Sequence, residues 1–177
     1  FPTQGWQARK WLIDYHAEFP SVKRTNGDFK TQLIRNGYVS NPFGRRYYLR
    51  SSEAYKCLNY ECQGTSADLM KRAMVDICVW LRENGFKSRL LMTVHDELVI
   101  EMPRSEQKVV VPAVIALMEE HGMFRIPIEV DAEVVTRRWS EKVSPEDVGI
   151  DWEACRRSSK LLHTVKKTKW SSRGIPA

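Results

Sequence analysis

Apolar residues recur along this chain with the spacing of three amphipathic helices. In the first stretch they follow a period of three to four residues until Pro20: Ala8, Trp11, Leu12, Tyr15 and Phe19. This spacing gathers apolar side chains on one helical face, and a proline stops a helix because it lacks an N–H donor. The same period predicts a second helix from residue 69 to Asn84-Gly85. It also predicts a third over 110–118, with Pro112 as a kink or a late start.

Shorter stretches predict strands. Residues 38–39 and 45–49 flank the turn sequence Asn-Pro-Phe-Gly, and 126–130 alternates like a last strand. Between the second and third helices, residues 90–101 indicate two short strands joined by a charged turn.

The charged turn, His95-Asp96-Glu97, is the first candidate for chemistry. Two carboxylates at the tip of a hairpin suit a cation, and Mg²⁺ takes one or two carboxylates and completes its shell with water and substrate phosphates. A solvated turn with charges at its tip is the alternative, and for these three residues alone it is favoured.

Composition narrows the class of protein but not its activity. With 177 residues, 42% hydrophobic and 28% charged, the chain has the profile of a soluble globular domain. No apolar run approaches the roughly 20 residues of a membrane span. The four cysteines lack zinc-site spacing, so we expect reduced thiols and a cytoplasmic location. The net charge of +6 fits a polyanionic partner.

Two longer motifs identify a family. Residues 59–71 read Asn-Tyr-Glu-Cys-Gln-Gly-Thr-Ser-Ala-Asp-Leu-Met-Lys, and Val-His-Asp-Glu follows at 94–97. Both resemble, in order and at a suitable distance, motifs of family A DNA polymerases, the DNA polymerase I type. The Gly-Arg-Arg sequence at 44–46 and the stretch from 126 to Trp139 are also similar to segments of that family.

The resemblance implies an α+β fold, in which an antiparallel hairpin and further strands pack with long helices. Residues 1–142 would form the carboxyl-terminal part of the polymerase palm domain. Residues 143–177 would be a basic tail with room for one helix over 151–163.

The resemblance also implies the reaction, which is template-directed addition of deoxynucleotides to a primer in DNA replication or repair. Asp96 matches one of the two carboxylates that hold a pair of Mg²⁺ ions, and Glu97 is a weaker metal-binding candidate. His95 would sit by the primer terminus, with a turn histidine of no role as an equal alternative.

Other residues match positions that contact DNA. Asn59 and Gln63 lie four apart on one helical face, where amides can reach acceptors common to all base pairs in the minor groove. Four basic residues are candidates for phosphate contacts, although surface Arg and Lys are often only solvated charges: Arg45, Arg46, Lys56 and Lys71.

Two landmarks of the family are missing from this chain. Asp14 to Glu18 superficially resembles the other metal-binding strand, but its spacing is one residue short and its pattern is helical. No match to the nucleotide-binding helix lies upstream of the charged turn. We therefore expect primer-template DNA and deoxynucleoside triphosphates as partners, together with a parent chain or a separate amino-terminal polymerase polypeptide.

Two rival functions remain open at this point. One is a non-catalytic DNA-binding module derived from a polymerase, whose activity would not depend on Asp96. The other is a metal-dependent phosphohydrolase or nuclease built on the charged hairpin, which would cleave DNA alone.

Overall fold

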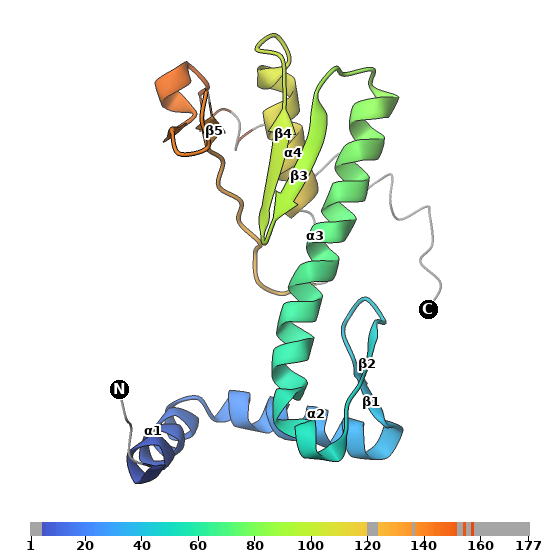
Figure 1. Ribbon diagram of the computed structural model, residues 1–177, viewed down its shortest axis with the longest axis vertical. Coiled ribbons are helices and arrows are strands. Elements are labelled where there is room, and N and C mark those ends of the chain that lie inside the picture. Colours follow the sequence, from blue (N-terminus) through green and yellow to red (C-terminus); the bar gives the residue numbers. More distant parts are fainter. Residues whose placement is uncertain (1–4, 120–123, 136, 152–153, 155–156, 158–177) are drawn as a thin grey trace. The chain divides into compact units, whose positions relative to one another are not determined.

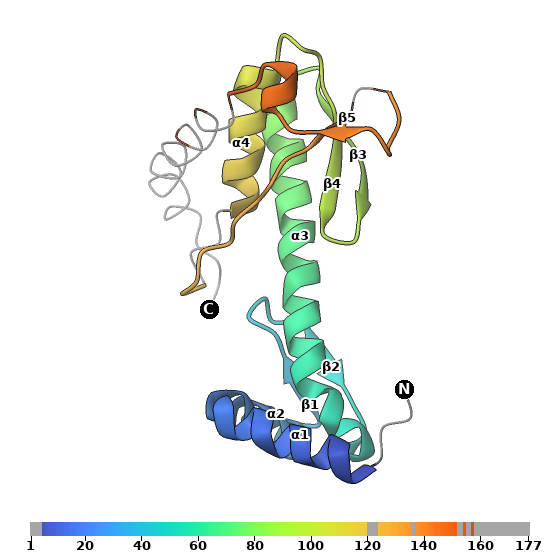
Figure 2. The ribbon, with the colours of Figure 1, turned by 90° about the vertical axis from the view of Figure 1, so that its left-hand side faces the viewer.

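The computed structural model describes residues 5–119, 124–135, 137–151, 154 and 157 (Figures 1 and 2). The chain divides into two compact units, Phe1–Asp68 and Leu69–Ala177. The division falls inside one long helix, α3 (Cys57–Glu83), which therefore contributes to both units.

The first unit opens with two helices where the sequence predicted one. Helix α1 covers Gly5–Glu18, and α2 covers Pro20–Asn36. Pro20 does end the predicted helix, and it also begins the next one. A proline is favoured in the first turn of a helix because the N–H that it lacks has no partner there.

A small hairpin and a short 3₁₀ helix complete this unit before α3. Strand β1 (Tyr38–Ser40) pairs antiparallel with β2 (Arg46–Tyr48), as the turn sequence predicted. The 3₁₀ helix η1 follows at Ser51–Lys56. Leu33, Val39 and Cys57 form the buried core between these elements.

The apolar stripe of α1 is exposed. No residue of this helix is buried, and Trp11 and Leu12 keep 62% and 56% of their surface accessible. The period of apolar residues thus predicted the helix correctly. The described part of the chain does not cover its apolar face.

The second unit is built on the carboxyl-terminal half of α3. After α3 ends at Glu83, strands β3 (Arg89–Val94) and β4 (Glu97–Glu101) form the predicted hairpin, and helix α4 (Gln107–Glu119) follows. Helix α4 packs beside α3 (Figure 2) through a core made of these residues: Ile77, Leu81, Val110, Val114 and Leu117. Of the two alternatives predicted for Pro112, a kink or a late start, the late start is wrong, because Pro112 lies inside α4.

The strand predicted over 126–130 is also wrong. Pro127 has no N–H to offer a strand ladder, and the N–H of Val130 donates to the Glu119 carboxylate at 3.1 Å. The last described strands are instead β5 (Val134–Val135) and β6 (Lys142–Val143), which pair with each other before the 3₁₀ helix η2 (Glu146–Val148).

The described residues combine helices with three antiparallel strand pairs, which confirms the α+β class. Among them, no helix has both the length and the apolar character that crossing a bilayer requires. Most of the expected tail at 143–177, including most of the expected helix at 151–163, lies outside the described residues.

Candidate functional site

The charged turn is a two-residue connection between β3 and β4. Val94 pairs with Glu97, so His95 and Asp96 occupy the two turn positions. His95 has a φ of 54°, the one positive value of a non-glycine residue in the described part of the chain. Tight hairpin turns require such a conformation and usually place glycine there, while histidine is among the few other residues that tolerate it.

The two carboxylates at this turn have different surroundings. The Glu97 carboxylate accepts a bond from Lys142 Nζ at 3.1 Å, and the same nitrogen lies 2.7 Å from Glu133. Hydrogen bonding to these two carboxylates raises the pKa of Lys142, and the bond to Glu133 has the larger effect. Asp96 is exposed and makes no ion pair or hydrogen bond with the described residues. Of the two predicted ligands, Asp96 is therefore the one whose oxygens are available to a cation.

The described residues do not complete a metal site around Asp96. No group of three or more His, Cys, Asp or Glu side chains is close enough to hold an ion in the part of the chain that the structure describes. One exposed carboxylate is a poor ligand set for Mg²⁺, which needs several oxygens at fixed positions.

In the first unit, the amide residues predicted to contact DNA share one face of α3. Asn59 and Gln63 are both exposed and line an open depression of about 490 Å³. Lys56, at the end of η1, lines the same depression. The structure thus brings together three of the predicted DNA-binding residues.

Tyr47 forms another wall of this depression, and its position depends on Gly64. A Cβ added at Gly64 would overlap the Tyr47 hydroxyl, so only glycine lets the phenol ring lie against α3. The ring also packs against Tyr60, with centroids 5.5 Å apart. Burial, and secondarily the Asp68 charge, raise the pKa of Tyr47.

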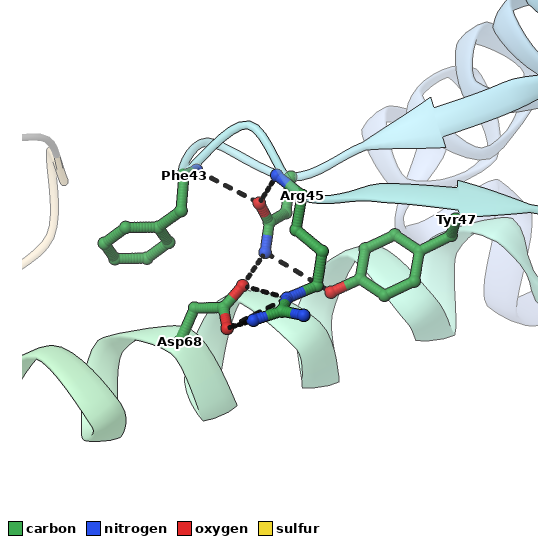
Figure 3. A network of polar contacts seen from close by, with 5 residues as sticks. Phe43, Arg45, Tyr47 and Asp68 are labelled. Atoms are coloured by element: carbon green, nitrogen blue, oxygen red, sulfur yellow. Dashed lines mark hydrogen bonds and ion pairs between the residues drawn. The ribbon is translucent and has the colours of Figure 1, made fainter.

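A network of polar contacts attaches the β1–β2 turn to α3 (Figure 3). Arg45 donates to both Asp68 oxygens, with Nε 2.7 and 3.0 Å and Nη2 2.7 Å from them. The Asn41 amide donates to Asp68 at 2.8 Å, and its oxygen accepts the N–H groups of Phe43 and Arg45. Asp68 is buried, and its bonds raise the pKa of Arg45.

The remaining predicted basic residues have varied partners. The Arg46 guanidinium lies over the Tyr38 ring, 4.7 Å from its centroid. Lys56 Nζ bonds to Glu53 at 3.0 Å, which raises the pKa of Lys56. Lys71 is exposed and lies in the second unit.

Comparison with known proteins decides the family. The model of DNA polymerase family A matches residues 3–141. The chain belongs to this family. The predicted resemblance to family A DNA polymerases is therefore confirmed.

Individual relatives support the same assignment. The chain is 35% identical over 135 residues to DNA polymerase I of Geobacillus stearothermophilus, a match that covers 71% of this chain and 15% of the relative. It is 36% identical over 155 residues to DNA polymerase I of Chloroflexus aurantiacus, covering 80% of this chain and 16% of the relative. The chain thus spans about a sixth of the length of these family A polymerases.

A solved structure is similar as well. The polymerase domain of Pol1 from M. smegmatis, in complex with a DNA primer-template and dNTP, superposes with a TM-score of 0.66 at 28% identity. The similarity covers 73% of this chain and 24% of that domain.

The sequence did not single out several residues that organise this family A segment. Asp68 lies inside the recognised motif at 59–71, and a charged residue between Ala67 and Leu69 was the available signal. Asn41 was assigned only to a turn, although asparagine commonly bonds to backbone N–H groups there. Lys142 gave no signal, because it lies 45 residues from Glu97.

Proposed function

We propose that this chain forms part of the catalytic centre of a DNA-directed DNA polymerase, as the carboxyl-terminal part of the palm over residues 1–142. One observation carries the proposal. Asp96 lies in the family-matched segment, exposed at a tight turn, while its acidic neighbour Glu97 is bonded to Lys142.

In this proposal Asp96 contributes one carboxylate to a two-metal Mg²⁺ site whose other ligands lie outside the described residues. Such a pair of ions stabilises the attacking and leaving oxygens of phosphoryl transfer. Glu97 is bonded to Lys142 and contributes charge near the site rather than a direct ligand bond. His95 sits beside Asp96 in the turn and would position the primer terminus through its imidazole.

The first unit would hold the primer-template. Asn59 and Gln63 present exposed amides from one face of α3, which can bond to the minor-groove acceptors found in all base pairs. Lys56 lines the same depression and adds positive charge. Sequence-independent contacts of this kind suit an enzyme that must accept any template.

Arg46 and Lys71 would contact backbone phosphates. Arg45 is a weaker candidate than Arg46 because both oxygens of Asp68 already balance its charge. Since the chain spans about a sixth of its relatives, binding of deoxynucleoside triphosphates would depend on polymerase segments outside it.

Primer extension tests this proposal. The full chain is mixed with Geobacillus stearothermophilus DNA polymerase I truncated before the matching segment, and extension is followed with Mg²⁺ and four deoxynucleotides. We expect extension only in the mixture, and its loss with Asp96→Asn. Glu101→Gln is the matched control, because Glu101 is an exposed carboxylate of the same hairpin.

A second candidate is the non-catalytic DNA-binding module. The observation in its favour is that three predicted DNA-contacting side chains share one depression. Full retention of DNA binding, with no extension in any mixture, would support this candidate over the polymerase.

A further inference from the structure

We propose that the outer face of the β1–β2 hairpin, formed by Tyr38, Arg46 and Tyr48, binds single-stranded DNA by base stacking. We call these three residues the hairpin platform. The proposal rests on the proposed function, because it takes DNA as the partner, and it adds a site for unpaired nucleotides.

The register of the hairpin places the three side chains on one face. Tyr38 pairs with Tyr48, and the next pair, Val39 with Tyr47, points the other way into the core. Because side chains alternate along a strand, Arg46 returns to the face of the two tyrosines. Contacts agree with this placement, since the two rings lie 5.6 Å apart and Arg46 covers the Tyr38 ring at 4.7 Å.

The hairpin platform offers an accessible aromatic ring beside a positive charge. Tyr48 keeps 71% of its surface exposed, so a base can reach its ring. Arg46 is exposed and has no acidic partner among the described residues. Its planar guanidinium carries five N–H donors, which a phosphate can accept at this exposed position.

This combination favours a single strand over a duplex. Proteins that bind unpaired strands without sequence preference combine aromatic side chains, on which bases stack, with basic groups that follow the backbone. In a duplex the base faces are covered by neighbouring base pairs. A duplex could therefore use the charge of Arg46 but not the ring of Tyr48.

Fluorescence anisotropy with a labelled 12-nucleotide oligo-dT and the full chain tests the hairpin platform. We expect Tyr48→Ala to weaken binding about tenfold, the range found for loss of one stacked base. Tyr48→Phe keeps the ring and should bind like the unchanged chain. Tyr55→Ala is the matched control, because Tyr55 is 69% exposed beside Lys56 but lies on η1.

The same variants are then measured with a 12-base-pair duplex, where Tyr48→Ala should leave affinity unchanged. The proposal is overturned if oligo-dT does not bind, if Tyr48→Ala binds it normally, or if Tyr55→Ala loses as much. An equal loss on the duplex would also overturn it. Circular dichroism and thermal unfolding check that each variant is folded.

Failure of this proposal is distinguishable from failure of the proposed function. Extension that depends on Asp96, with oligo-dT binding indifferent to Tyr48, would remove the hairpin platform and leave the polymerase assignment. Binding that depends on Tyr48, without extension in any mixture, would leave the hairpin platform and remove the proposed polymerase function.

Discussion

The Asp68 carboxylate binds the Arg45 guanidinium through both of its oxygens, across 23 residues of sequence. The next residue, Arg46, is instead exposed and lies over the Tyr38 ring. Two adjacent arginines of one motif therefore have different roles. Arg45 attaches the hairpin to α3, and Arg46 keeps its charge exposed at the surface.

This difference predicts different salt dependence of DNA binding. Arg46→Ala should lower the slope of log K against log salt by about 0.9, the value for one phosphate contact on duplex DNA. Arg45→Ala should leave the slope unchanged, because Asp68 already balances its charge, and should lower the thermal unfolding temperature instead. Binding titrations of a primer-template duplex at several salt concentrations measure the slope. Equal slopes for both variants would refute the distinction.

Gly64→Ala should destabilise the first unit because its Cβ would displace the Tyr47 ring from α3. We expect a loss of about 2 kcal/mol in the free energy of unfolding, as in other overpacked sites. In a Tyr47→Ala background the same change should stabilise by up to about 1 kcal/mol, because alanine is the better helix former. Urea unfolding of the unchanged chain, the two single variants and the double variant gives the complete double-mutant cycle. Additive effects would show that Tyr47 and Gly64 are not coupled.

The two acidic residues after His95 should differ in their importance for primer extension. Asp96→Asn should reduce extension in the mixed assay at least a hundredfold, whereas Glu97→Gln should reduce it less than tenfold, because Lys142 already holds the Glu97 carboxylate. Lys142→Met should release Glu97 and make extension more sensitive to ionic strength. If Glu97→Gln proved as damaging as Asp96→Asn, Glu97 would be a direct ligand as well.

Stability of the second unit should fall in acid through Glu106. Its carboxylate accepts the Ser88 hydroxyl at 2.6 Å and the N–H groups of Lys87 and Ser88 at 2.9 Å. These bonds, that of the Ser88 hydroxyl foremost, lower the pKa of Glu106. A lowered pKa means that the contribution is complete above the unfolded value of about 4.3 and is lost as the pH falls through the folded value.

The check for Glu106 is thermal unfolding of the chain and of Glu106→Gln between pH 3 and 7. Steps of about one pH unit define the slope of stability against pH. The substituted chain should be less stable at pH 7 and should lose less on acidification. If the curves of stability against pH were parallel for the two proteins, the acid sensitivity would belong to other carboxylates.

Local patterns in the sequence predicted most elements of the fold. The period of apolar residues predicted α1 and the second half of α3, and the turn residues predicted the hairpins at 38–48 and 89–101. These features depend on neighbours within a few residues, which is the range that a pattern can report.

Features that depend on distant residues could not be predicted in this way. Residues 126–130 alternate like a strand, but a strand forms only when another strand offers it a ladder, and Val130 bonds to Glu119 instead. The bonds from Asp68 to Arg45 and from Lys142 to Glu97 join residues far apart in the chain. The family motifs located the charged turn and the α3 face, but not the partners that distinguish Asp96 from Glu97.

The bare apolar face of α1 also gives the chain an optical signal of its own. Trp11 on this face is 62% exposed, so its indole ring emits at the long wavelengths typical of contact with water. Trp80 is partly buried and stacks on Phe86 at 4.9 Å, so its emission would change less. Any protein surface that covers α1 would shift the emission to shorter wavelength, so association could be followed in solution without an attached dye.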